Sequence, residues 1–139
     1  GVRRVLFRSL AEQIKLKEFI IKNKDGVYQE LSTQGKKLSD SVKAKILLTR
    51  AFIKKPKLVL LDDFTYVLTR RDKNHITDFL FNSNQQNSII IKTSDEEIMK
   101  KCDRVLFMHE GKIIADGSFD KIAATEEFKL ISDELYELN

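Results

Sequence analysis

Two adjacent carboxylates, Asp62 and Asp63, directly follow the four apolar residues Leu58–Leu61. A short apolar run bounded by Pro56 and by polar residues downstream predicts a strand buried on both faces of a parallel sheet. Open α/β sheets bind ligands at the carboxyl ends of their strands, and two neighbouring carboxylates suit a hydrated divalent cation. The alternative interpretation is a solvated strand end that happens to be acidic.

A helix N-terminus at Ser39 is the second candidate for chemistry. Serine is a favoured N-cap residue, and Asp40 adds a carboxylate to the first turn. We expect this helix to run to about Ile53 and to stop before Pro56. Its expected buried residues include Val42, Ile46, Leu47 and Phe52.

The remaining elements follow from hydrophobic periodicity and turn signals. Helices are expected at residues 10–22, 71–81, 95–101, 118–124 and 125–138, and strands at 88–92, 105–108 and 112–115. The strand at 88–92 should also be buried, and Glu110-Gly111 should join the last two strands as a hairpin. Ser118 and Thr125 are expected to cap the last two helices, and residues 27–35 and 82–86 are expected to form a loop and a turn. This order predicts an α/β sheet whose front part is missing.

The composition is that of a soluble globular domain, with 139 residues, 42% of them hydrophobic and 33% charged. No stretch approaches the ~18 apolar residues that span a membrane, and no secretory leader is expected. The single cysteine, Cys102, excludes an internal disulfide and is expected to serve packing. His75 and His109 are far apart, which argues against a zinc site.

The net charge of +4 depends on the first nine residues, because Arg3, Arg4 and Arg8 lie there without an acid. Removing these three charges from +4 leaves +1, so nucleic-acid binding is not expected. The run Leu6–Ser9 is what a common sequencing adapter encodes in one frame, so residues 1–9 are interpreted as a non-native leader and the gene as cut at its 5′ end. The basic cluster on and before the Ser39 helix is interpreted as a solvated face; its members are Lys36, Lys37, Lys43 and Lys45.

Several motifs occur together in the order and spacing of an ATP-binding cassette (ABC) nucleotide-binding domain. That family has G-x-x-L-S-G-G-Q-x-x-R, then A-R-A-L, a proline and L-L-L-L-D-E; the matching residues here are Gly35–Lys45, Arg50-Ala51, Pro56 and Leu58–Asp63. The chain resembles the exporter type most, because Phe19-Ile20 and Gly26 are similar to its F-I-x-x-L-P-x-G-Y pattern. Downstream, the family's T-H, A-D-R-I, G-K-I and E-G-S/T are similar to Thr93-Ser94, Cys102–Val105, Gly111–Ile113 and Asp116–Ser118. The register holds without a gap from Leu10 to about Ile122.

The resemblance covers the second half of such a domain. It implies a P-loop NTPase-like parallel sheet with a helical subdomain, its N-terminal half missing. The implied parts are a partial nucleotide-binding domain at 10–124, divided into the helical subdomain with its signature helix at 10–54 and the catalytic remainder at 55–124, and a C-terminal helix at 125–139. The phosphate loop G-x-x-x-x-G-K-[ST], the adenine-stacking aromatic and the glutamine loop do not occur in these residues. The chain is therefore expected to bind ATP poorly, and to be inactive, on its own.

The resemblance also implies a signature segment facing the γ-phosphate of an ATP held by a second domain. In this chain the segment is Leu38, Ser39, Asp40 and Ser41, with both signature glycines replaced. Near a protein surface, a carboxylate about 4 Å from phosphate charge would cost ~4 kcal/mol, more than the ~1 kcal/mol that a helix N-terminus returns. The alternative is that Ser39 and Asp40 only cap and charge-match the helix.

Four other positions carry implied roles. Asp62 matches the aspartate that holds Mg²⁺ through water, and Asp63 matches the catalytic glutamate but is one methylene shorter. Positioning errors of ~1 Å can cost about a hundredfold in rate. Ser94 replaces the switch histidine and carries no charge, and Thr69 stands at the D-loop aspartate position. These departures predict a degenerate site that turns ATP over slowly.

The resulting hypothesis is the ATP-binding part of an export-type transporter, with ATP and Mg²⁺ in the intact protein. Its expected partners are a second nucleotide-binding domain, as a homo- or heterodimer, and a transmembrane domain upstream in the same polypeptide. The expected location is the cytoplasmic face of the plasma (inner) membrane. The substrate cannot be read, because transporters choose cargo in their membrane segments.

Two alternatives belong to other functional classes. One is an ABC-type ATPase without a membrane domain, which acts in regulation or on nucleic acid. Its coiled-coil relatives would need long heptad segments, and none is visible in this sequence. A phosphoacceptor receiver domain would need the acid pair on its first strand and another aspartate at the end of its third. The apolar runs at 89–91 and 105–108 end without one.

Overall fold

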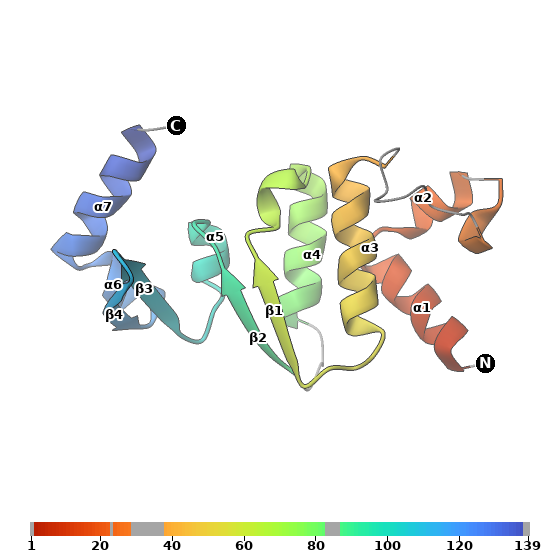
Figure 1. Cartoon of the computed structure of the whole chain (residues 1–139), viewed down its shortest axis with the longest axis horizontal. Helices are drawn as coiled ribbons and strands as arrows, with labels where there is room; N and C mark the ends of the chain where they lie inside the picture. The colour runs from red at the N-terminus through yellow and green to blue at the C-terminus, as the bar shows by residue number, and fades with distance from the viewer. Residues whose placement is uncertain (1, 23, 29–37, 83–86, 138–139) are drawn as a thin grey trace. The chain divides into compact units, whose positions relative to one another are not determined.

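The structure, a computed structural model, describes residues 2–22, 24–28, 38–82 and 87–137 (Figure 1). Its elements are α1 (Val2–Gln13), α2 (Lys17–Lys22), η1 (Gly26–Tyr28), α3 (Asp40–Phe52), β1 (Leu58–Asp62), η3 (Thr65–Val67), α4 (Arg70–Asn82), β2 (Ser88–Lys92), α5 (Glu96–Met99), β3 (Val105–His109), β4 (Lys112–Gly117), α6 (Phe119–Ala123) and α7 (Glu126–Glu137). They form two compact units, residues 1–92 and 93–139, and each is described by itself. Gly35, Lys36, Lys37 and most of the predicted loop and turn at 27–35 and 82–86 lie outside the described residues.

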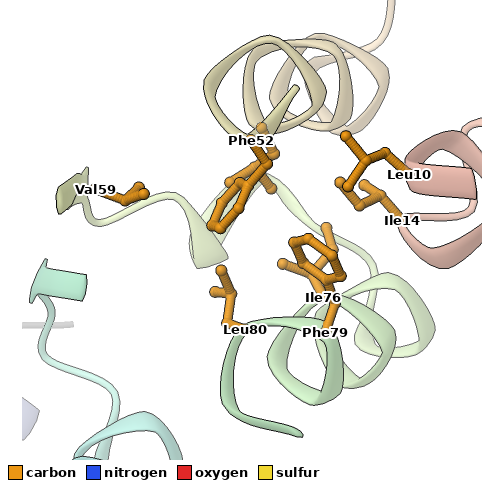
Figure 2. Close-up of a cluster of buried hydrophobic side chains, with 8 residues drawn as sticks. Leu10, Ile14, Phe52, Val59, Ile76, Phe79 and Leu80 are labelled. Carbon is orange, nitrogen blue, oxygen red and sulfur yellow. The ribbon is translucent and has the colours of Figure 1, made fainter. Parts of the chain in front are cut away.

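The first unit contains a parallel pair of strands, β1 and β2, packed against helices. The register runs from Leu58 opposite Ser88 to Asp62 opposite Lys92, which confirms the predicted parallel pairing. Figure 2 shows side chains from α1, α3, α4 and β1 meeting in one core. The rings of Phe52 and Phe79 meet there edge to face, with centroids 5.0 Å apart. The buried cluster is Leu10, Ile14, Leu48, Phe52, Val59, Ile76, Phe79 and Leu80.

The prediction that both strands are buried on both faces is wrong. Val59 is buried in the core, but Leu60 is 69% exposed and its neighbour Ile90 is 60% exposed. Successive side chains of a strand point to opposite faces, and α3 and α4 pack only on the face that carries Val59 and Leu61. In the described part of the chain, the other face remains apolar and open to solvent.

The predicted helix at 10–22 is in fact two helices, α1 and α2. Lys15 adopts a left-handed φ of 59°. The amide of Leu16 donates to Ala11 O at 2.7 Å and that of Lys15 donates to Glu12 O at 3.2 Å. This 6→1 and 5→2 pair ends α1 as a Schellman motif. The break buries Leu16 together with Leu10, Ala11 and Ile14.

The helix predicted at 39–53 is confirmed as α3, but its buried face differs from the predicted one. Of the residues expected inside, Phe52 is buried, whereas Leu47 is 60% exposed. The buried residues follow the i, i+3, i+4, i+7 spacing of one helix face; they are Lys45, Leu48, Thr49 and Phe52. Leu47 lies on the opposite side of that helix.

The helix predicted at 71–81 is confirmed as α4. Its three predicted core residues, Ile76, Phe79 and Leu80, are all buried.

The second unit is a hairpin, β3–β4, with three helices. Glu110 and Gly111 both have positive φ, 47° and 75°, as the predicted tight hairpin turn requires. Residues from α6 and α7 form a small core with Phe107 of β3, in which Phe128 lies against both Phe107 and Phe119. The predicted cap by Thr125 is confirmed by the Phe128 amide at 3.3 Å. Ser118 is the N-cap residue of α6, as predicted, but its side chain makes no capping hydrogen bond.

Candidate functional site

The carboxyl end of the β1–β2 pair carries the two predicted acidic residues. Asp62 is the last residue of β1 and is exposed, whereas Asp63 is half-buried. The Asp63 amide donates to Lys92 O at 2.9 Å, and the Thr65 hydroxyl donates to the Asp63 carboxylate at 3.3 Å. The two carboxylates therefore sit in different surroundings, one held by η3 and one in solvent.

Lys92, which sequence reasoning missed, pairs directly with Asp62. Its Nζ lies 2.8 Å from Asp62 Oδ1, and both side chains are largely exposed. The hydrogen bond and charge of Asp62, with a smaller contribution from Asp63, raise the pKa of Lys92. The available signal was the register, because two parallel strands of five residues that start opposite each other also end opposite each other.

The strand tips do not form a ready-made magnesium site. Mg²⁺ is held in proteins by oxygen ligands, but here a lysine ammonium lies against the carboxylate assigned to it. In the part of the chain that the structure describes, no group of three or more histidine, cysteine, aspartate or glutamate side chains could hold a metal ion. The chain's own residues thus do not fit a tightly held Mg²⁺ at Asp62.

The signature segment lies where the sequence predicts, at the start of α3. Ser39 has extended backbone and its Oγ accepts from the Val42 amide at 3.4 Å, so it is the N-cap. Asp40 is exposed in the first turn and pairs with Lys43 at 2.9 Å. Leu38 is half-buried just before the cap. The segment thus presents a helix N-terminus, which favours anions, beside a carboxylate, which repels them.

Ser41 belongs to a buried charge cluster rather than to the solvent face. Its hydroxyl donates to Asp72 at 2.8 Å, and Lys45 Nζ lies 2.7 Å from the same carboxylate. Lys45 also donates to the carbonyl of Lys15 at 3.5 Å. Thr69, the predicted D-loop residue, caps α4 by accepting from the Asp72 amide at 3.2 Å. The cluster thus joins the first turns of α3 and α4.

Asp72 is ionised in this cluster. Burial would raise the pKa of its carboxyl group, but hydrogen bonds from Lys45 and Ser41, the Lys45 charge and the Thr69 contact outweigh burial and leave the pKa below its usual value. The prediction that Lys45 lies on a solvated face is therefore wrong. The signal was its spacing, since Lys45 precedes Leu48 and Thr49 by three and four residues on the buried face.

Ser94 lies in the second unit, in the segment between β2 and α5, and is exposed. Residues on both sides of Ser94 hold the backbone of this segment. The Asp95 amide donates to Thr93 Oγ1 at 3.0 Å, and Asp95 is the N-cap of α5. Cys102 is half-buried and donates to Ile98 O at 3.4 Å. Burial and the charge of Asp103 raise the pKa of its thiol, which favours an inert packing role.

A separate groove lies along the C-terminal half of α3 and includes none of the predicted site residues. Its lining residues are Leu47, Arg50, Ala51, Ile53, Lys54 and Pro56. Because Ser39 caps the other end of the helix, the groove and the signature segment are different surfaces.

Sequence comparisons point to one family, although no protein-family model matches the chain. Multidrug resistance protein homolog 65 of Drosophila melanogaster is 26% identical over 126 residues, which is 91% of this chain and 10% of that protein. The energy-coupling factor transporter ATP-binding protein EcfA1 of Mycoplasmoides gallisepticum is 30% identical over 109 residues, 78% of this chain and 39% of that protein. The chain therefore spans well under half the length of these relatives.

The fold comparison agrees with the sequence comparisons. A bacterial Atm1-family ABC exporter with ATP bound matches 96% of this chain with a TM-score of 0.84, at 20% identity and over 24% of that structure's chain. Among the helices that the structure describes, none has both the length and the apolar character that a membrane crossing needs. With the motif spacing and the parallel strand pair, these findings agree with the resemblance to an ATP-binding cassette nucleotide-binding domain: the chain is similar in sequence to parts of ATP-binding cassette transporter proteins and has the fold of part of an ATP-binding cassette exporter.

Proposed function

We propose that this chain is part of the ATP-binding component of an export-type transporter. It faces ATP at an interface with a second nucleotide-binding domain and is coupled to a transmembrane domain at the cytoplasmic face of a membrane. The names of the relatives support this proposal, since one is a multidrug resistance protein, one is an ATP-binding protein and the matching structure is an exporter with ATP bound. The chain covers only a small part of each of these proteins, so its coupling to ATP hydrolysis, its role in transport and its partners are proposed here.

The observation that carries the proposal is the shared side of three structural features in the first unit. In Figure 1 the N-terminal end of α3, the η3 turn and the head of the β1 arrow all lie toward the upper side of that unit. Ser39 is the N-cap of α3, Thr65 begins η3 and Asp62 ends β1. A helix start that favours anions thus lies on the same side as the carboxyl end of a parallel strand, which is where open α/β sheets bind ligands.

The same residues support a weak site. Asp40 places a carboxylate in the first turn of α3, where phosphate would be held. Asp63, at the glutamate position, is shorter by one methylene and is engaged by the Thr65 hydroxyl. Ser94, at the histidine position, brings no positive charge to the γ-phosphate. We therefore propose that this site hydrolyses ATP slowly and contributes to transport mainly by binding ATP.

The anion-binding part of the proposal can be tested on the chain alone. Amide NMR signals of residues 38–42 should shift on titration with ATP, weakly in the wild type. Asp40→Asn should strengthen binding several-fold, because it removes the nearest negative charge and frees Lys43. The matched control is Asp120→Asn, which removes an exposed carboxylate from the first turn of α6. Shifts elsewhere but not at 38–42, or equal strengthening by both variants, would contradict the proposal.

The catalytic part requires the assembled transporter. Asp63→Glu should raise the rate of ATP hydrolysis by at least about tenfold, because a positioning error of ~1 Å at this group costs up to about a hundredfold. Asp63→Asn should lower the rate instead. A wild-type rate that Asp63→Glu leaves unchanged would show that Asp63 does not limit turnover.

A further inference from the structure

The pairing of Asp62 with Lys92 is set by backbone register rather than by chance contact of long side chains. The two residues are partners in the parallel ladder and are the last residues of their strands. The Asp63 amide, which donates to Lys92 O at 2.9 Å, closes the ladder directly beyond the pair. Both Cα positions are thus held by main-chain hydrogen bonds, and the ammonium needs only its own rotamers to reach Asp62 Oδ1 at 2.8 Å.

A lysine at this place has the same chemistry toward Asp62 as a hydrated cation. An ammonium brings one positive charge and three hydrogen-bond donors, and a hydrated Mg²⁺ held through its water donates to the same carboxylate oxygens. The two oppose each other at this exposed carboxylate, because both are cations and an ammonium beside Asp62 repels a second positive charge.

We propose that Lys92 is a built-in counter-cation of Asp62, which occupies this carboxylate and weakens the binding of divalent cations at the strand tips. The inference rests on the proposed function, because the resemblance to ATP-binding cassette domains assigns Asp62 to the Mg²⁺ of a bound nucleotide. It makes this site less dependent on Mg²⁺ than one in which the aspartate has no lysine partner. It also adds a positive charge beside a carboxylate pair that would otherwise repel phosphate.

The size of the effect follows from exposure. The side chains of Lys92 and Asp62 are 80% and 79% exposed, and ion pairs in such surroundings interact only weakly. Removing the competing ammonium should therefore tighten divalent-cation binding at Asp62 by up to about fivefold.

The test uses the full chain and Mg²⁺ alone, without nucleotide. Amide NMR shifts of residues 61–63 and 92 are followed during Mg²⁺ titration at constant ionic strength, and Mn²⁺ broadening of the same signals gives a second readout. Lys92→Met should tighten binding about two- to fivefold, whereas Lys92→Arg, which keeps the charge, should bind as weakly as the wild type.

Lys57→Met is the matched control, because it removes one lysine charge just before the other end of β1, about 16 Å away along the strand. Equal affinity of Lys92→Met and Lys57→Met would overturn the inference. Asp62→Asn separates the inference from the proposed function. If Asp62→Asn leaves the Mg²⁺ response of the wild type unchanged, the cation-facing role of Asp62 fails. If Asp62→Asn removes the response but Lys92→Met does not tighten it, only the counter-cation role fails.

Discussion

Two lysine–aspartate pairs in the first unit have nearly the same length but opposite surroundings. Lys45 and Asp72 are 2.7 Å apart with side chains only 10% and 14% exposed, whereas Lys92 and Asp62 are 2.8 Å apart and almost fully exposed. The first pair joins two helices, and the second joins the ends of two strands. The two pairs are thus nearly equal in N–O distance but differ in their exposure to solvent.

The difference shows how one kind of contact serves two purposes. Breaking a buried pair leaves an uncompensated charge in a low-dielectric interior and costs several kcal/mol. An exposed pair is screened by water and contributes little to stability. We infer that Lys45–Asp72 maintains the fold and that Lys92–Asp62 controls which charges the strand tips present.

The buried pair also supports the candidate site indirectly. Through Ser41 it reaches the first turn of α3, next to the signature residues Ser39 and Asp40, and through Thr69 it reaches the start of α4. The signature segment and the D-loop residue are therefore both hydrogen-bonded to Asp72, the first through the Asp72 carboxylate and the second through the Asp72 backbone amide.

The largest expected effect comes from breaking the buried pair on one side. Asp72→Asn should lower the free energy of unfolding of the first unit by about 2–3 kcal/mol, because Lys45 keeps its charge and loses its partner. Urea unfolding followed by amide NMR signals of residues 40–52 measures this loss. A loss below about 0.5 kcal/mol, the size expected for an exposed pair, would abolish the contrast between the two pairs.

The stabilisation that Asp72 gives to the first unit should depend on pH. The pKa of Asp72 is lowered in the folded chain, so its ionised form stabilises the fold above about pH 3.9, the usual aspartate value. This stabilisation is lost as the pH falls through the lower folded-state pKa. The gap in unfolding free energy between wild type and Asp72→Asn should thus be constant near neutral pH and close below about pH 4. A gap that widens on acidification would contradict an ionised Asp72.

Replacing both partners of the buried pair should cost much less than replacing one. In Lys45→Met/Asp72→Leu no charge is left unpaired, and buried ion pairs exchanged for apolar residues are often neutral in stability. We expect the double variant to lie within about 1 kcal/mol of the wild type in the same urea measurement. A loss as large as that of Asp72→Asn would show that the specific hydrogen bonds of the cluster, including that of Ser41, are required.

The smallest expected effect is on the exposed pair. Lys92→Met should leave the free energy of unfolding nearly unchanged, and the change should be smaller still at high salt, because an exposed pair is screened. Its effect should appear instead in cation binding. Destabilisation equal to that of Asp72→Asn would mean that the strand ends, and not the helix cluster, hold the first unit together.

Elements with strong local signals could be read from the sequence. Ser39 and Thr125 cap their helices as predicted, and Glu110-Gly111 turns the hairpin as predicted. These signals depend on a few neighbouring residues whose backbone and side chains satisfy each other, so no knowledge of the fold is needed. The acid pair at the end of β1 belongs to the same class, since a strand and its end are local features.

Burial and pairing could not be read in the same way. Periodicity shows which residues share a face but not which face a neighbouring element covers, so Leu47 and Leu60 were expected inside and Lys45 outside. The lysine partners of Asp62 and Asp72 lie 30 and 27 positions away in the sequence. Only the tertiary structure brings them together.

The sequence by itself therefore indicated the family resemblance, most of the order of the elements and the chemical types at the site. The tertiary structure decided which charges meet and how much water surrounds them. The physical reason is that capping and turn formation depend on the nearest residues, whereas the strength of an ion pair depends on distance and dielectric, and both are set by packing between distant segments.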